Sequence, residues 1–153
     1  MDGDPCRHDL AALEACAVIE LYEGVPGSGK SYHAICEKFL PWVRQGRRLY
    51  ISVDGIYLDR LALFTGIELT VLEQQITIWK DSVEVLQAFP HVEPGSAVII
   101  DEAQTVFRSM QKVEPGLLRW LETHRHYGVD ILLMSQDFLQ MSQWVTRLIE
   151  ATV

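Results

Sequence analysis

Cysteines and long apolar runs are scarce in this sequence. Its three cysteines, Cys6, Cys16 and Cys36, form no CxxC pair, which argues against a disulfide framework or a zinc site and favours a reducing compartment. No apolar run reaches the roughly 18 residues of a membrane-spanning helix, and the acidic N-terminus is unlike a secretory signal. We therefore expect no membrane span in this chain.

Basic residues are outnumbered by acidic ones. The sequence has 13 Lys and Arg against 21 Asp and Glu, a formal net charge of −8. Because nucleic acids are bound mainly through Lys and Arg that neutralise phosphates, the chain gives no strong nucleic-acid signal. Its densest basic patch, Arg44, Arg47 and Arg48, falls where a helix is expected to end, and cations there complement the helix dipole.

The 153 residues are enough for one domain with a real core, and 48% of them are hydrophobic. Residues 1–16 precede the first convincing strand, so we interpret them as a leader and residues 17–153 as the folded domain. Apolar runs predict strands at 18–22, 48–53 and 97–100, a weaker one at 76–79, and another buried strand at 131–134. The stretch between the strand at 48–53 and the weaker strand at 76–79 is ambiguous.

Helical periodicity separates several of these strands. The apolar residues after Ser31 recur with helical spacing as far as Val43, with a kink expected at Pro41. A second helix is expected from the Glu-Pro-Gly at 114–116 to His124, and a last one through Trp144, Leu148 and Ile149. Strands that alternate with helices indicate an α/β fold with a parallel sheet covered on both faces.

A glycine-rich phosphate loop lies between the first strand and the first helix, and it satisfies GxxxxGK[ST]. Backbone N–H groups of such a loop surround phosphate oxygens, and the following helix presents its positive dipole end. We expect Lys30 to reach the β- and γ-phosphates and the Ser31 hydroxyl to bind Mg²⁺. The predicted nucleotide-binding residues are Gly24, Val25, Pro26, Gly27, Ser28, Gly29, Lys30, Ser31 and Tyr32.

Two acidic residues follow the buried strand at 97–100. Asp101 is placed to hold Mg²⁺ through its water shell, as the acid at the end of a strand beside a phosphate loop does. Glu102 points differently and is the candidate general base that polarises the attacking water. The alternative for such a pair is an ordinary helix N-terminus, which also favours acids.

Gln136 lies at the carboxyl end of the predicted strand at 131–134, just after its last residue. Ligands of open α/β sheets bind at the carboxyl ends of the strands. The Gln136 amide is therefore a candidate to sense the γ-phosphate or to position water, the alternative being a loop amide bound to backbone. Phosphoryl transfer also often needs an arginine, from the same or a neighbouring subunit. The sequence alone offers Arg108, Arg119, Arg125 and Arg147 for that role.

Three segments together resemble the zonular occludens toxin domain, a family that includes the gene I assembly proteins of filamentous bacteriophages. They are GVPGSGKSYHAI at 24–35, VIIDEAQ at 98–104 and THRHYGVDILLMSQD at 123–137. The resemblance implies a Mg-dependent ATPase domain on the cytoplasmic side of the bacterial inner membrane that powers virion assembly and export. It also implies that Lys30, Ser31, Asp101, Glu102, Arg125 and Gln136 are the functional residues.

For the fold, we expect a P-loop NTPase of the RecA/FtsK-like type, in which the strand of Gln136 lies between those of Lys30 and Asp101. We also expect a homo-oligomer that joins an inner-membrane phage assembly complex. Members of the family continue into further strands and a transmembrane helix, so residues 17–153 are interpreted as an NTPase domain that is incomplete at its C-terminus. Glu20 falls within a predicted central strand, where it needs an Arg or Lys partner.

Other functions remain open at this point. A superfamily-one helicase fragment shares IIDEAQ and a downstream Gln, although it would need a second lobe and a basic DNA channel. Another alternative is a nucleotide switch that docks partners and does not hydrolyse the nucleotide. A turnover assay would distinguish it from an ATPase. A small-molecule kinase would need an arginine-rich lid, and a GTPase would need an NKxD or TKxD signature; the sequence has neither.

Overall fold

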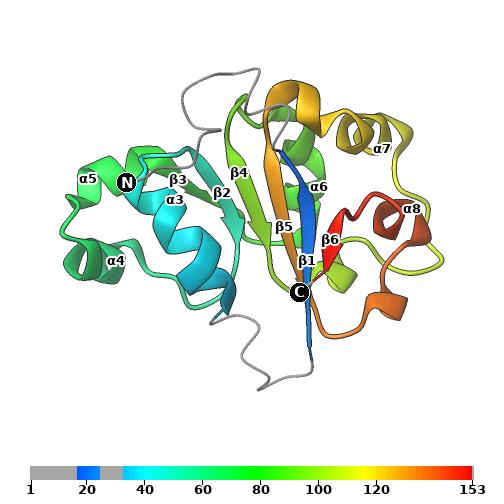
Figure 1. The fold of residues 1–153 in the computed structure, drawn as a ribbon, viewed down its shortest axis with the longest axis horizontal. Coiled ribbons are helices and arrows are strands. Elements are labelled where there is room, and N and C mark those ends of the chain that lie inside the picture. The colour runs from blue at the N-terminus through cyan, green and yellow to red at the C-terminus, as the bar shows by residue number, and fades with distance from the viewer. Residues whose placement is uncertain (1–16, 25–32, 153) are drawn as a thin grey trace.

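A computed structural model describes residues 17–24 and 33–152 of this protein. Its centre is a parallel sheet of six strands in the order β3-β2-β4-β5-β1-β6 (Figure 1). The strands are β1 (Ile19–Glu23), β2 (Leu49–Ser52), β3 (Ile76–Ile78), β4 (Ala97–Ile100), β5 (Asp130–Ser135) and β6 (Ala151–Thr152). The strand of Gln136 therefore lies between the strand that enters the glycine-rich loop and the strand that ends at Asp101, which confirms the predicted order.

The two faces of the sheet are buried under different helices, which confirms the predicted layers. Along β5, Leu132 and Met134 face the first layer, while Ile131 and Leu133 face the second. This alternation follows from the two-residue period of a strand. The first layer contains the helix after residue 32, α4 (Leu58–Thr65) and α5 (Leu69–Gln75); the second contains α6 (Ser82–Ala88), α7 (Pro115–Glu122) and α8 (Gln143–Thr146).

The helix that follows the glycine-rich loop is irregular at the predicted position. It has π-helical hydrogen bonding over η2 (Ile35–Phe39) and returns to an α-helix over α3 (Leu40–Arg44). The Leu40 N–H donates to Ile35 O, five residues back. Pro41 has no N–H to offer to Glu37 O, so the wider turn falls where the regular α-helical bond cannot form.

Several elements differ from the sequence-based expectation. The ambiguous stretch after β2 forms the two short helices α4 and α5, and α6 was not expected at all. The last helix is shorter than predicted, because α8 ends at Thr146 and the chain then turns toward β6. Short 3₁₀ segments complete the fold: η3 (Phe89–His91), η4 (Ala103–Thr105), η5 (His124–Tyr127) and η6 (Phe138–Gln140). Within residues 17–24 and 33–152, none of the helices has both the length and the apolar character to cross a bilayer.

Candidate active site

The carboxyl ends of β1, β5 and β4 lie side by side at one edge of the sheet. The Gly24 N–H donates to Ser135 O at 3.1 Å, and the Asp101 N–H donates to Ser52 O at 2.9 Å. The glycine-rich loop therefore begins directly beside Ser135 and Gln136. The rest of that loop, from Val25 to Tyr32 and including Lys30 and Ser31, lies outside the described residues.

The strand and the helix on either side of this loop are joined by two side-chain contacts. Lys38 Nζ lies 3.0 Å from Glu20 Oε1, so the carboxylate inside β1 has the basic partner that we expected. The Tyr22 hydroxyl donates to Glu37 Oε2 at 3.2 Å. Burial, together with the nearby Glu37 carboxylate, raises the pKa of Tyr22 to about 12. These contacts join β1 to the helix that follows the loop.

Glu102 has an unusual backbone conformation. Its φ of 50° and ψ of 48° lie in the left-handed region, which residues with a Cβ rarely adopt. Such a conformation costs on the order of 1 kcal/mol. The Glu102 N–H donates to Asp101 Oδ1 at 2.8 Å, and the Thr105 N–H donates to Glu102 O at 2.9 Å. The chain therefore turns sharply where β4 ends.

The Glu102 carboxylate is directed toward the end of β5 by two glutamines. Gln136 Nε2 donates to Glu102 Oε1 at 3.4 Å, and Gln104 Nε2 donates to Glu102 Oε2 at 2.5 Å. Gln104 Oε1 in turn accepts from the Ser135 hydroxyl at 2.9 Å. The structure thus brings together Glu102 and Gln136, two residues that are 34 positions apart in the sequence. A carboxylate and an amide that share a hydrogen bond are a suitable pair to orient one water molecule.

The donor set at this edge fits magnesium chemistry. Asp101 offers a half-buried carboxylate where β4 ends, one strand away from the glycine-rich loop. Mg²⁺ prefers oxygen ligands and usually takes only one or two from the protein, the rest coming from phosphates and water. Within 17–24 and 33–152 no cluster of three or more His, Cys, Asp or Glu side chains is arranged for a metal.

Arg125 lies at the opposite edge of the sheet from Glu102 and Gln136. It belongs to η5, which immediately precedes the amino end of β5, and it forms an ion pair with Glu150. The neighbouring His124 is buried, and its Nδ1 donates to Val129 O at 2.7 Å. Burial lowers the pKa of His124, with a smaller effect from Arg125. The structure therefore does not bring Arg125 to the other predicted residues of the same copy.

The basic patch at the end of α3 has structural contacts. Arg47 Nη1 pairs with Asp130 Oδ2 at 2.7 Å, and the same guanidinium donates to the carbonyls of Gly95, Ser96 and Gly128. Arg48 donates to Gln75 O at 2.8 Å and lies over the Tyr50 ring. These arginines connect elements at the amino edge of the sheet.

Two residues of the carboxyl edge were missed by sequence reasoning. Gln104 positions the Glu102 carboxylate, and its signal was present as the last letter of DEAQ. Glu23 Oε2 accepts the Phe138 N–H at 2.5 Å and so ties the end of β1 to the segment that follows Gln136. The sequence held no signal for Glu23, because this contact joins positions 115 residues apart.

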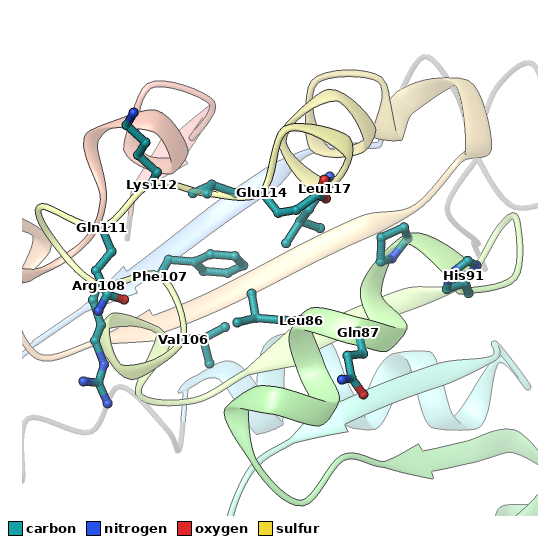
Figure 2. Close-up of a pocket in the computed structure, with 12 residues that line it drawn as sticks. Leu86, Gln87, His91, Val106, Phe107, Arg108, Gln111, Lys112, Glu114 and Leu117 are labelled. Carbon is teal, nitrogen blue, oxygen red and sulfur yellow. Dashed lines mark hydrogen bonds between the residues drawn. The ribbon is translucent and has the colours of Figure 1, made fainter.

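A separate cavity of about 490 Å³ lies between α6, the 106–114 segment and the start of α7. Figure 2 shows Leu86, Val106, Phe107 and Leu117 gathered around its centre, with Arg108 and Lys112 extending away at its rim. Neither Asp101, Glu102 nor Gln136 lines it. The cavity is therefore not part of the carboxyl-edge site, although the segment that lines it begins at Val106, just after η4.

This chain matches one protein family and is similar to two phage proteins. The profile of the family described as zonular occludens toxin (Zot) matches residues 18–153. The gene 1 protein of Xanthomonas phage phiLf is 27% identical over 139 residues, covering 82% of this chain and 30% of its own length. ORF301 of Pseudomonas phage Pf3, which carries the description of an assembly protein, is 31% identical over 126 residues, covering 78% of this chain and 36% of its own length. The chain thus spans about a third of the length of these two relatives.

Solved structures share the fold. The genome packaging NTPase B204 of Sulfolobus turreted icosahedral virus 2, in complex with ATP-gammaS, matches with a TM-score of 0.64 at 21% identity, covering 87% of this chain and 71% of that one. The N-terminal domain of zonular occludens toxin from Neisseria meningitidis matches with a TM-score of 0.57 at 25% identity, covering 87% of this chain and 73% of that one. The predicted P-loop NTPase fold is confirmed.

Proposed function

Because this chain belongs to the zonular occludens toxin family, we propose that it is the ATP-binding and ATP-hydrolysing motor domain of a filamentous phage assembly and export protein. The relatives support a role in phage morphogenesis, since one is a phage gene 1 protein and another carries the description of an assembly protein. The NTPase fold supports a nucleotide-driven role. ATP as the nucleotide, hydrolysis and magnesium dependence are parts of the proposal.

The observation that carries the proposal is the hydrogen bond between Gln136 and Glu102 at the end of β5. This bond joins Gln136, which follows β5, to Glu102, the second residue after β4. Both lie at the edge of the sheet where the glycine-rich loop begins. If Glu102 had only a structural role, its carboxylate could form a surface hydrogen bond from an ordinary backbone conformation. Its left-handed backbone is therefore a second sign of a functional role. Backbone strain of this kind is characteristic of functional sites, where it directs a side chain toward a ligand.

Each residue has a defined part in the proposed reaction. Gly24 to Tyr32 surround the phosphates, and Lys30 neutralises the β- and γ-phosphates as charge moves onto them. Glu102 accepts a hydrogen bond from the attacking water, and Gln136 orients that water or the γ-phosphate. Ser31 and Asp101 hold Mg²⁺. A magnesium ion held there would supply positive charge that offsets the charge developing on the phosphate oxygens.

The proposed setting extends beyond this chain. The matches cover only 30% and 36% of the two relatives, so the inner-membrane assembly complex would be reached through regions outside these 153 residues. We propose a cytoplasmic position for the domain, because a motor of this kind uses cytoplasmic ATP. We also propose that it acts as a homo-oligomer, since a neighbouring copy is a common source of the arginine that completes phosphoryl transfer.

Replacement of Glu102 by Gln tests hydrolysis separately from binding. A water-polarising carboxylate acts mainly in the transition state, so Glu102→Gln is expected to keep the Mg·ATP affinity of the parent within about threefold and to lower phosphate release at least 100-fold. The measurements are calorimetric titration and a phosphate-release assay at several protein concentrations. The matched control is Glu122→Gln, an exposed change at the end of α7 that should leave both quantities unchanged.

Two outcomes would contradict this assignment. If Glu102→Gln lost binding and hydrolysis together, the carboxylate would not be a base that acts only in the transition state. If the parent bound Mg·ATP and released no phosphate at any protein concentration, the chain would be a nucleotide-dependent switch, and the motor proposal would fail.

A further inference from the structure

Nine of the thirteen exposed large apolar side chains in the described part of the molecule lie in two places. The first is the segment from Asp54 to Glu73, which contains α4 and α5; its exposed members are Tyr57, Leu63, Phe64, Leu69 and Val71. The second consists of residues 108–112 together with 138–147, and its exposed members are Met110, Phe138, Leu139 and Trp144. Leu63 is 87% exposed and Leu139 is 79% exposed. Such clusters are characteristic of contact surfaces.

The two parts of the second place form one continuous surface. The Ser109 N–H donates to Gln140 O at 2.9 Å, and the Ser142 N–H donates to Phe107 O at 2.8 Å. Arg108 and Met141 form an antiparallel bridge between the two segments. Met110, Trp144 and their neighbours also line a shared hollow of about 290 Å³. We call residues 108–112 together with 138–147 the basic surface. We call the segment 54–73 the acidic surface.

The charges of the two surfaces are complementary. The acidic surface carries Asp54, Asp59, Glu68 and Glu73, all exposed, and its one basic residue is Arg60, which lies over the Tyr57 ring. Arg44 approaches from α3 and lies over the Phe64 ring. The basic surface carries Arg108, Lys112 and Arg147, all exposed, and its two segments contain no Asp or Glu. Opposite charge around apolar side chains is the arrangement that guides two specific surfaces together.

The two surfaces lie at opposite ends of the sheet. The acidic surface connects β2 to the edge strand β3, and the basic surface leads into the other edge strand, β6. Figure 1 shows α4 and α5 at one end of the long axis and α8 at the other. One copy therefore cannot bring its own two surfaces together, whereas two copies in line can.

We propose that the acidic surface of one copy binds the basic surface of the next copy, in a head-to-tail contact. The acidic surface offers a hollow of about 360 Å³ lined by apolar residues that include Phe39, Tyr57 and Phe64. An exposed side chain such as Leu139 is of a suitable size and character to enter it. A head-to-tail contact repeats, and it gives a ring where the rotation closes and a filament where it does not. The inference specifies the contact of the homo-oligomer proposed above and rests on that proposal.

The contact adjoins the candidate active site. The basic surface begins at Phe138, two residues after Gln136, and the Phe138 N–H is bound to the Glu23 carboxylate at the end of β1. Its other segment follows Glu102 through η4. A neighbour seated on this surface would therefore lie against the two segments that carry Glu102 and Gln136.

Two exposed leucines allow a direct test in the 153-residue chain. Leu63→Lys places a positive charge where a basic partner binds, and Leu139→Glu places a negative charge where an acidic partner binds. Each variant alone is expected to sediment as a monomer at concentrations where the parent associates. An equimolar mixture is expected to form a one-to-one dimer, because each variant keeps the surface that the other lacks. Matched controls are Val83→Lys and Val83→Glu, at a 60% exposed position on α6 outside both surfaces.

The result is read from sedimentation velocity without nucleotide, so failure of ATP binding or hydrolysis would not affect it. The contact is refuted if the parent is monomeric at every concentration, if either variant associates as the parent does, or if the mixture remains monomeric. A symmetric contact between two acidic surfaces would leave Leu139→Glu associated, and a symmetric contact between two basic surfaces would leave Leu63→Lys associated. Circular dichroism verifies the fold, and Val71→Lys with Met110→Glu provides a second pair.

Discussion

The backbone of Glu102 determines where its carboxylate lies. With φ at 50°, the chain turns sharply after β4, and the side chain reaches Gln104 and Gln136. The sequence predicted that Glu102 would point differently from Asp101, and this stays a prediction. It could not predict the left-handed conformation, because Glu has no intrinsic preference for it and the surrounding fold imposes it.

A pair of substitutions at position 102 tests this strain. Gly adopts the left-handed region without a Cβ penalty, so Glu102→Gly is expected to be more stable than Glu102→Ala by about 1 kcal/mol, the reverse of the usual order of Ala and Gly. Urea denaturation followed by fluorescence gives the free energies of unfolding. Equal stabilities, or a more stable Ala variant, would mean that the left-handed backbone is not maintained in solution.

Among the structural elements, the segments before β4 and β5 share one side-chain partner at the amino edge of the sheet. Arg47, just beyond the end of α3, contacts the starts of β4 and β5 through Asp130 and three carbonyls. The sequence suggested only that basic residues complement the end of a helix. The carbonyl partners, at positions 95, 96 and 128, were beyond sequence reasoning because they depend on how distant segments meet.

Loss of this connection should reduce stability without affecting the nucleotide site. Arg47→Ala is expected to lower the free energy of unfolding by about 3 kcal/mol, because it leaves the mostly buried Asp130 carboxylate without its cation. Affinity for Mg·ATP at low temperature, where the variant remains folded, should match that of the parent. Arg44→Ala, an exposed change in the same basic patch, is the control and should cost less than about 0.5 kcal/mol. Equal effects of the two changes would contradict the structural role of Arg47.

The elements differ in how strongly their own sequences predict them. The five main strands were predicted within about two residues, since buried parallel strands read as continuous apolar runs. The helix through Val43 was predicted together with its irregularity at Pro41, because a missing N–H has a local consequence. α4, α5 and α6 were missed, as each is only seven or eight residues long and depends on packing against the sheet more than on its own pattern.

At the scale of the whole molecule, the position of Arg125 limits its function. It lies at the amino edge, while Glu102 and Gln136 lie at the carboxyl edge of the same sheet. A catalytic role therefore requires a second copy that brings its amino edge to the site. Arg125 lies outside both surfaces of the proposed head-to-tail contact, so its role is an independent prediction.

Mixing two inactive variants tests that role. Arg125→Ala and Glu102→Gln are each expected to hydrolyse ATP at less than about 1% of the parent rate. In a mixed oligomer some sites combine an intact Glu102 with an intact Arg125 from the other variant, so activity should partly return. Arg119→Ala on α7 is the control and should remain active alone. If co-assembly is shown by sedimentation and mixing restores nothing, Arg125 is a structural partner of Glu150 and not a catalytic residue.

The central claim, that this chain binds ATP through its glycine-rich loop, is tested most directly by one calorimetric titration with Mg·ATP. Lys30 is the only basic side chain in that loop, and its ammonium would lie against phosphate oxygens. The parent is expected to bind, and Lys30→Ala is expected to bind at least tenfold more weakly, a loss of about 1.4 kcal/mol. Lys80→Ala, an exposed change after β3, should bind as the parent does. Equal affinity of the parent and Lys30→Ala, or no binding by the parent, would contradict the account.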